Sequence, residues 1–158
     1  MVQCRSYRYL TLSLSRRSVS PAPVAGRQEG RRMLTVLIVD DNASYRGSLR
    51  DLLREHLPDV LVVEAADGKE ALEQIRRTDP DLAFIDIELV EESGLDLTRK
   101  IREDHGDMPI AVITSYDLPE YRLAARECGA SCFFSKIANS AKDIFAWITS
   151  VSPDVVTA

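Results

Sequence analysis

Five side chains of this 158-residue chain are of types that could carry out chemistry together: Asp40, Asp41, Asp86, Thr114 and Lys136. Two carboxylates about 5 Å apart repel by roughly 3 kcal/mol at an effective dielectric near 20, so the three aspartates need a cation if they meet. Carboxylate oxygens with water completing the shell suit Mg²⁺ better than zinc or copper. The acidic residues therefore predict a magnesium site.

The remaining residues of this set predict phosphoryl chemistry. Asp86 ends an apolar run, so its carboxylate should lie near a sheet and act as a positioned nucleophile. A carboxylate can accept a phosphoryl group when a metal ion and an ammonium neutralise the transferring oxygens, and we assign the second role to Lys136. Thr114 would donate its hydroxyl to the same phosphoryl group. Taken singly, each residue could instead be a helix cap, a strand residue or a solvated charge.

The segments that must position these residues alternate between strand and helix patterns. Short apolar runs rich in β-branched residues predict five strands, and they span residues 34–39, 60–63, 82–87, 110–113 and 131–134. The five candidate residues follow or end four of these runs. Capping alone does not readily explain that coincidence.

Helical spacing separates the apolar runs. Apolar side chains recur at i, i+4, i+7 and i+8 from Tyr45, and a second helix is expected around residues 71–75. Further helices are expected from Gly94, over residues 118–127 with Gly129 ending the helix, and over residues 144–151 after Asn139 or Ser140 as N-cap. Strands and helices in this order predict an α/β fold, a doubly wound parallel sheet built from five βα units. Ligands of such sheets bind beyond the carboxyl ends of the strands.

Length and composition bound the class of protein. The chain has the size of one domain, 45% apolar and 28% charged residues, and no apolar run near the 18 or so residues of a membrane span. Residues 1–32 hold seven Arg, no Lys and one Glu, a balance of +6, which leaves 13 basic and 24 acidic residues, a balance of −11, for residues 33–158. We expect a soluble, cytoplasmic protein whose main domain repels nucleic acid.

Residues 1–32 form a basic extension rich in Arg and Ser, and we expect it to be disordered. A transit peptide, a basic arm for nucleic acid or anionic lipid, and a segment without function all fit this composition. Met33 directly precedes the first strand pattern, so translation could also begin there. The sequence leaves these alternatives open and places the folded domain at residues 33–158.

From residue 34 to about residue 151 the sequence resembles the receiver domain of two-component response regulators. Asp40 and Asp41 look like the acidic pair that binds the metal with Asp86, the phosphorylated aspartate of the family. Thr114 looks like the switch hydroxyl, and Lys136 looks like the lysine of the site.

Two further spacings agree with the resemblance. Gly94 falls eight residues after Asp86, like the family's turn glycine, and Phe133 falls three residues before Lys136, where the family has its switch aromatic. The resemblance implies a flavodoxin-like sheet with the strand order 2-1-3-4-5. It also implies that Thr114 moves toward the phosphoryl group and that Phe133 enters the space that it leaves.

The resemblance further implies a function in a phosphorelay. A histidine kinase or a histidine phosphotransfer protein would donate the phosphoryl group, and Asp86 would become an aspartyl phosphate with Mg²⁺ as cofactor. The protein would be a signalling phosphoacceptor that catalyses its own phosphorylation and dephosphorylation, and not an enzyme acting on other substrates. Because the chain ends seven residues after Val151, we expect a stand-alone receiver without a DNA-binding domain. It would signal by docking on a target protein or by passing the phosphoryl group onward.

The sequence departs from the family pattern in two loops. Ile137 follows Lys136 where the family usually has proline, which removes the basis for a cis peptide, since a non-proline cis bond costs about 3 kcal/mol. Val90 and Glu91 stand where a proline is often found, and with Glu88 they belong to an acidic loop that could weaken the binding of anionic phosphodonors.

Two positions are expected to tune the phosphoryl group's lifetime. Glu88 and Tyr116 stand two residues after Asp86 and Thr114, at positions that flank the phosphoryl group in the family. We expect the bulky side chain of Tyr116 to shield the phosphoryl group from water and slow hydrolysis.

Two other functions compete with this interpretation. A haloacid-dehalogenase-like phosphatase also uses Asp, Thr or Ser, Lys and Mg²⁺, but it places its acids in a DxD pattern after the first strand, whereas Asp40 and Asp41 are adjacent and Asp86 follows the third run. A degenerate receiver would be a binding module that works without phosphorylation. That second alternative predicts no phosphoryl transfer at all.

Overall fold

The structure is a computed structural model that describes residues 33–153. Five parallel strands form one sheet in the order β2-β1-β3-β4-β5. The strands are β1 (Thr35–Val39), β2 (Leu61–Ala65), β3 (Leu82–Asp86), β4 (Ile110–Thr114) and β5 (Cys132–Ser135). Both the predicted strands and the strand order implied by the resemblance are confirmed. The predictions about residues 1–32 lie outside the described residues.

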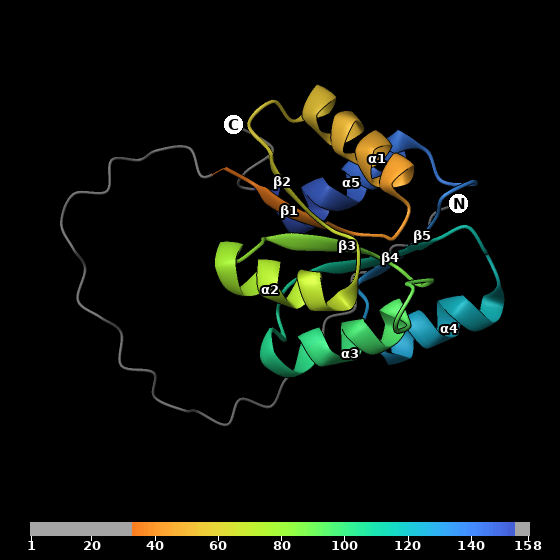
Figure 1. Cartoon of the computed structure of the whole chain (residues 1–158). Coiled ribbons are helices and arrows are strands. Elements are labelled where there is room, and N and C mark those ends of the chain that lie inside the picture. Colours follow the sequence, from red (N-terminus) through yellow and green to blue (C-terminus); the bar gives the residue numbers. More distant parts are fainter. Residues whose placement is uncertain (1–32, 154–158) are drawn as a thin grey trace.

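A helix follows each strand, and the helices cover both faces of the sheet (Figure 1). They are α1 (Ala43–His56), α2 (Gly68–Thr78), α3 (Gly94–Asp104), α4 (Pro119–Glu127) and α5 (Ala141–Val151). Helices α1 and α5 lie on one face, and α2, α3 and α4 lie on the other. The chain therefore has the doubly wound, flavodoxin-like α/β architecture that the sequence predicted. Between residues 33 and 153, no helix has the length and apolar character needed to cross a membrane.

Local hydrogen bonds explain where the helices begin and end. The side chain of Asn42 accepts from the backbone N–H groups of the first turn of α1, and Asp67 caps α2 in the same way. Helix α5 begins after Ser140, whose N–H donates to Asp143 Oδ2 at 2.9 Å. Helix α4 ends before Gly129, which adopts φ +89°, a conformation that favours glycine.

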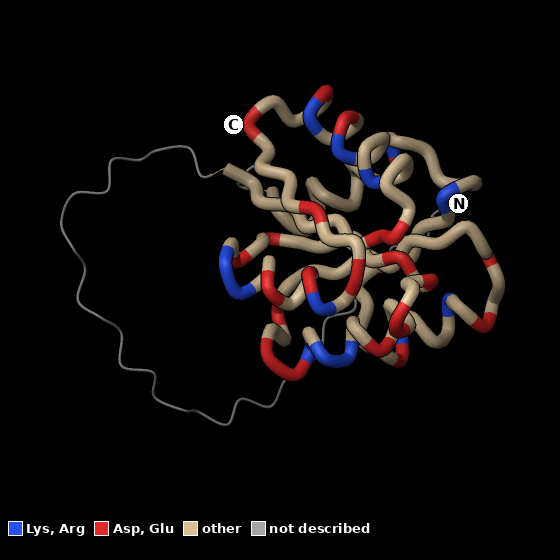
Figure 2. The backbone as a smooth tube through the Cα atoms, in the orientation of Figure 1, with Lys and Arg blue, Asp and Glu red and all other residues tan. Residues whose placement is uncertain are grey.

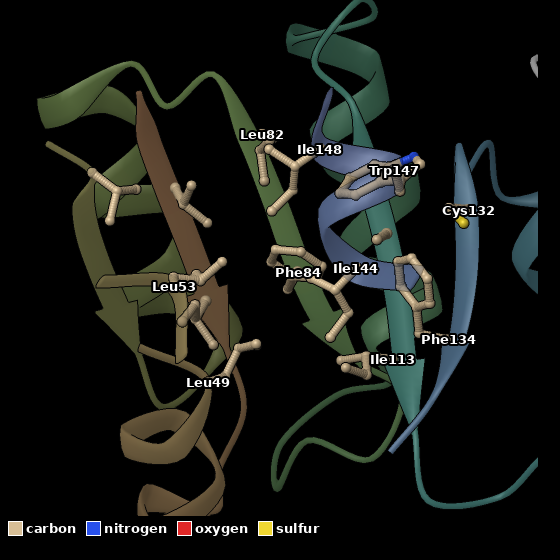
Figure 3. Close-up of a cluster of buried hydrophobic side chains, with 14 of the residues drawn as sticks. Leu49, Leu53, Leu82, Phe84, Ile113, Cys132, Phe134, Ile144, Trp147 and Ile148 are labelled. Atoms are coloured by element: carbon tan, nitrogen blue, oxygen red, sulfur yellow. The ribbon is translucent and has the colours of Figure 1, made fainter. Parts of the chain in front are cut away.

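The core between the sheet and the helices α1 and α5 is built around three aromatic side chains (Figure 3). The rings of Phe84 on β3 and Trp147 on α5 have centroids 5.4 Å apart in an edge-to-face arrangement. Phe134 on β5 meets the Trp147 ring at 5.9 Å, also edge to face. These contacts fasten α5 to two strands of the sheet and fix the level of their carboxyl ends.

The opposite face of the sheet has a separate apolar core. Leu37 and Ile85 point toward α2 and α3, where they pack against Ile75 and Leu97. A smaller cluster around Val112 holds α4 against β4 and β5. Burial on both faces explains why the strands read as continuous apolar runs and not as alternating ones.

Replacing Phe84 with alanine tests the aromatic core. We expect Phe84→Ala to lower the free energy of unfolding by about 3–5 kcal/mol, since it leaves a cavity against Trp147. Leu123→Ala is the matched control, because Leu123 is 54% exposed on α4 and its loss should change stability by at most about 0.5 kcal/mol. Urea denaturation followed by circular dichroism measures both values. Equal stabilities for the two variants would contradict this view of the core.

Candidate functional site

The register of the sheet brings the predicted site residues to one edge. Val39 pairs with Ile85, so Asp40 and Asp86 emerge at the same level from neighbouring strands. Thr114, at the end of β4, pairs with Ser135 on β5, the residue before Lys136. Acidic segments meet where the loops after β1 and β3 approach each other (Figure 2). Four of the five strands thus contribute to one site, as the positions of the polar residues predicted.

Three aspartates at this edge are close enough to hold one metal ion. Asp40, Asp41 and Asp86 each offer a carboxylate oxygen, and these oxygens lie within 4.8 Å of one another. Asp40 is 0% and Asp86 4% exposed. Within the described part of the chain, Asp86 Oδ1 is buried without a hydrogen-bond partner, and Asp40 Oδ2 is buried with the ammonium of Lys136 as its partner. Buried carboxylate oxygens without donors are costly unless a cation shares them. The donor set therefore fits a hard divalent cation such as Mg²⁺.

The ammonium of Lys136 lies between two of these carboxylates. Its Nζ atom donates to Asp86 Oδ2 at 2.8 Å and forms an ion pair with Asp40 Oδ2 at 2.6 Å. Burial lowers the pKa of Lys136, but the contacts with Asp86 and Asp40 outweigh this effect, so the pKa is raised and the ammonium stays charged. Only 10% of the lysine side chain is exposed, which strengthens its attraction to the acids.

The contact with Lys136 only partly offsets the cost of burying the ionised carboxylate of Asp86. Burial raises the pKa of its carboxyl group, and the hydrogen bond and charge of Lys136 only partly reverse the shift. The neighbouring charge of Asp40 raises it further. A second cation would stabilise the ionised form, which agrees with the fit of the three aspartates to a metal ion.

The lysine loop is supported by residues that the sequence did not assign to the site. Ser135 Oγ accepts from the backbone N–H groups of Ile137 and Ala138, at 3.3 and 3.1 Å. Asn139, which the sequence suggested only as a possible N-cap, accepts from Ser135 N–H at 2.7 Å. No cis peptide occurs in residues 33–153, so the bond from Lys136 to Ile137 is trans, in agreement with the missing proline. Side-chain hydrogen bonds shape this loop in the absence of that proline.

The comparisons with known proteins agree with this geometry. Residues 36–155 match the response regulator receiver domain family. This chain belongs to that family. As in receiver domains generally, its acidic cluster is of the kind that binds Mg²⁺.

Similar proteins place the receiver domain in several contexts. A protein-glutamate methylesterase/protein-glutamine glutaminase from Geobacillus kaustophilus is 34% identical over 107 residues, which cover 66% of this chain and 30% of that protein. Response regulator MprA from Mycobacterium leprae is 35% identical over 103 residues, which cover 65% of this chain and 44% of that protein. The chain thus spans less than half the length of these two relatives.

A solved structure supports the fold over the whole described domain. The CheY-like receiver domain protein from Methanospirillum hungatei JF-1 is 25% identical, with a TM-score of 0.70 over 78% of this chain and 97% of that one. The fold predicted from the sequence is therefore that of CheY-like receiver domains.

Thr114 ends β4 beside the lysine loop, and its carbonyl oxygen accepts from the backbone N–H of Lys136 at 2.8 Å. Thr114 is fully buried, and its Oγ1 accepts from the N–H of Tyr116 at 3.2 Å. As an acceptor in this bond, the hydroxyl keeps its own proton for another oxygen. Tyr116 is 52% exposed and Glu88 is exposed, so both side chains stand at the surface of the site and not within it.

Phe133 lies outside the cluster of charged residues. Its ring is partly buried against Val112 and Ala125. The guanidinium of Arg122 lies over the ring, with its Cζ atom 4.8 Å from the ring centroid. Arg122 in turn donates two hydrogen bonds to Asp117, at 2.6 and 2.7 Å, which ties α4 to the loop after Thr114. The resemblance to the receiver family suggested Phe133 but not the arginine that covers its ring.

Gly94 sets the shape of the loop after Asp86. A Cβ atom at this position would lie 1.8 Å from the carbonyl oxygen of Asp86, so only glycine fits without a backbone shift. Its N–H donates to the carbonyl of Ile87 at 2.9 Å, which closes the loop just before α3 begins.

Two glycine substitutions with opposite expected signs test this contact. Gly94→Ala should lower the denaturation midpoint, since the new methyl group collides with the backbone of Asp86. Gly47→Ala is the matched control in α1, where the nearest atom is 3.7 Å away on a flexible arginine, and it should raise stability by about 0.5–1 kcal/mol. Thermal denaturation of both variants decides the question. A stabilising Gly94→Ala would contradict the close approach.

Proposed function

We propose that this receiver domain is the phosphoacceptor of a two-component phosphorelay and that Asp86 is the residue phosphorylated. The observation that carries the proposal is the environment of Asp86: Lys136 binds one of its oxygens, and the other is buried without a donor next to Asp40. A carboxylate held in this way has a cation on one side and a place for a second cation on the other. That environment suits the acceptance of a phosphoryl group.

The donor would be a phosphohistidine on a histidine kinase or a histidine phosphotransfer protein. One oxygen of Asp86 attacks the phosphorus while the bond between phosphorus and the histidine nitrogen breaks, and the imidazole leaves with that electron pair. Lys136 donates to a phosphoryl oxygen from its position beside Asp86. Thr114 would donate a hydrogen bond from its hydroxyl to another phosphoryl oxygen, since its hydroxyl oxygen accepts from Tyr116 N–H and its own proton is left free to donate.

Asp40, Asp41 and Asp86 would hold Mg²⁺ at this site. The ion would supply positive charge beside the transferring phosphoryl oxygens. Asp40 is itself oriented by the N–H of Asn42, which donates to its Oδ1 at 2.8 Å and leaves Oδ2 for cations. Asp41 is exposed and would complete the set from the solvent side.

Phosphorylation would signal through a shift between two conformations of the domain. Thr114 and Phe133 are the residues proposed to move, and the contact of Arg122 with Phe133 would have to change with them. The changed surface would dock on a target protein, or Asp86 would pass its phosphoryl group to another histidine. We propose the cytoplasm as the compartment in which the kinase and this domain meet.

Incubation with a small phosphodonor tests the proposed function. Phosphoramidate with Mg²⁺ should add the mass of one phosphoryl group to the chain, as read by intact-mass spectrometry. Asp86→Asn should abolish the addition, since an amide cannot form the acyl phosphate. Removal of Mg²⁺ with a chelator should reduce it to background.

The same experiment separates the competing functions. If no phosphoryl group is added and beryllofluoride does not bind, the chain works as a phosphorylation-independent binding module. If the phosphoryl group is added at Asp40 or Asp41, the result favours the phosphatase-like function and contradicts the receiver function. Peptide mapping locates the phosphoryl group on the chain, and the Asp41→Asn variant serves as the control.

Substitution of Tyr116 tests its proposed shielding role. Tyr116→Ala should lose the phosphoryl group several-fold faster than wild type, because the side chain no longer covers the path of water to the acyl phosphate. Leu118→Ala, which removes a neighbouring exposed side chain from the same loop, should leave the rate unchanged. The decay is followed on a phosphate-affinity gel, and slower decay of Tyr116→Ala would refute the shielding.

A further inference from the structure

We propose that Tyr45 is a positioning residue that holds the ammonium of Lys136 at Asp86 through the face of its ring. The proposal rests on the proposed function of Asp86 as phosphoacceptor and adds a residue to that site. It concerns the aromatic ring of Tyr45 and not its hydroxyl group.

The contact is between the lysine ammonium and the tyrosine ring. Lys136 Nζ lies over the ring of Tyr45, 4.4 Å from its centroid. A cation within about 6 Å of an aromatic centroid is attracted by the negative face of the ring, and the attraction grows when the cation is shielded from water. Only 10% of the lysine side chain is exposed, so this ammonium is well shielded.

Helix α1 fixes the ring in this place. Tyr45 lies in the first turn, where its backbone N–H donates to the side chain of Asn42 at 3.1 Å. The tyrosine side chain is partly buried and packs against the apolar core beneath the sheet edge. Its position is therefore set by the same loop that carries Asp40 and Asp41.

Among residues 33–153, the ammonium contacts Asp40, Asp86 and Tyr45, and of these three Tyr45 alone is not a proposed metal ligand. Asp40 and Asp86 pair with Lys136 and are also two of the three carboxylates that fit a divalent cation. When these carboxylates share their charge with a metal ion, their attraction for the ammonium falls. The attraction of the ring does not depend on those charges, so Tyr45 keeps Lys136 beside Asp86 in both situations.

The phenol hydroxyl is not required for this role. Burial raises the pKa of the Tyr45 phenol above its ordinary value, and the charges of Asp40 and Asp86 add to the shift. The group is therefore neutral, and it offers the lysine a ring face and not a phenolate charge. Phenylalanine at this position should serve equally well, whereas an aliphatic residue should not.

The first test reads the contact itself by NMR of the full-length protein with ¹³C-labelled lysine. The Cε protons of Lys136, assigned by their loss in Lys136→Ala, should be shifted upfield by the ring in wild type and in Tyr45→Phe. They should return toward the positions of exposed lysines in Tyr45→Leu and Tyr45→Met. Unshifted Cε protons in the wild-type protein would overturn the proposal.

The second test measures phosphorylation rates with phosphoramidate and Mg²⁺. Tyr45→Phe should match wild type, while Tyr45→Leu should be about fivefold slower, which corresponds to about 1 kcal/mol. In the background of Lys136→Ala, the further change of Tyr45 to leucine should have no effect, because Tyr45 acts through the lysine. Chemical denaturation confirms that the compared variants are folded, and Tyr45→Met replaces Tyr45→Leu if the latter is not.

The remaining outcomes each decide the question. Equal slowing by Tyr45→Phe and Tyr45→Leu would assign the effect to the hydroxyl, and equal slowing with and without Lys136 would assign it to packing; both overturn the proposal. If wild type accepts no phosphoryl group, the proposed function fails. The Cε shifts of Lys136 then decide by themselves whether the ring holds the ammonium.

Discussion

The charged group at the carboxyl ends of β1 and β3 is the constraint on which the rest of the site depends. Two buried carboxylates, Asp40 and Asp86, cannot stand side by side without a cation, and Lys136 supplies one from the end of β5. One lysine does not satisfy all of their oxygens. The fold thus places an incompletely neutralised carboxylate at a sheet edge, which is the environment that the proposed phosphoacceptor role of Asp86 requires.

The core makes this charge cluster possible because it holds the strand ends at one level. Phe84 lies two residues before Asp86 on the same strand, and its ring packs against Trp147 in α5. Phe134 lies two residues before Lys136, and its ring also packs against Trp147. Since alternate residues of a strand share a face, Phe84 lies on the same side of the sheet as Asp86, while Phe134 packs in β5 just before the loop that carries Lys136. Packing of the core and geometry of the site are therefore linked through two strands.

The two sides of the site are held by different contacts. On one side, Asn139 and Ser135 form hydrogen bonds within the lysine loop, and α1 carries Tyr45 against the ammonium. On the other side, Thr114 is followed by an exposed loop that is tied to α4 through the pairing of Asp117 with Arg122. Both side chains of this ion pair are partly exposed, so water can replace their hydrogen bonds when the pair separates. This asymmetry is consistent with the proposed conformational shift, which would act on the side of Thr114 and α4.

The sequence by itself determined the βα alternation, the strand bounds to within a residue or two, and the polar residues that end the strands, because these depend on apolar periodicity and on turn residues close along the chain. The resemblance to receiver domains added the role of Gly94 and the order of the strands in the sheet. Only the tertiary structure decided that Tyr45, a residue whose spacing marked it as part of a helix face, lies over Lys136, and that Asn139 binds the lysine loop while Ser140 caps α5. The contact of Tyr45 with Lys136 joins residues far apart in the chain, and its geometry follows from how α1 packs on the sheet, which no local pattern encodes. The roles of Asn139 and Ser140 depend on local hydrogen bonds, but both residue types can cap a helix, so the sequence left the choice between them open.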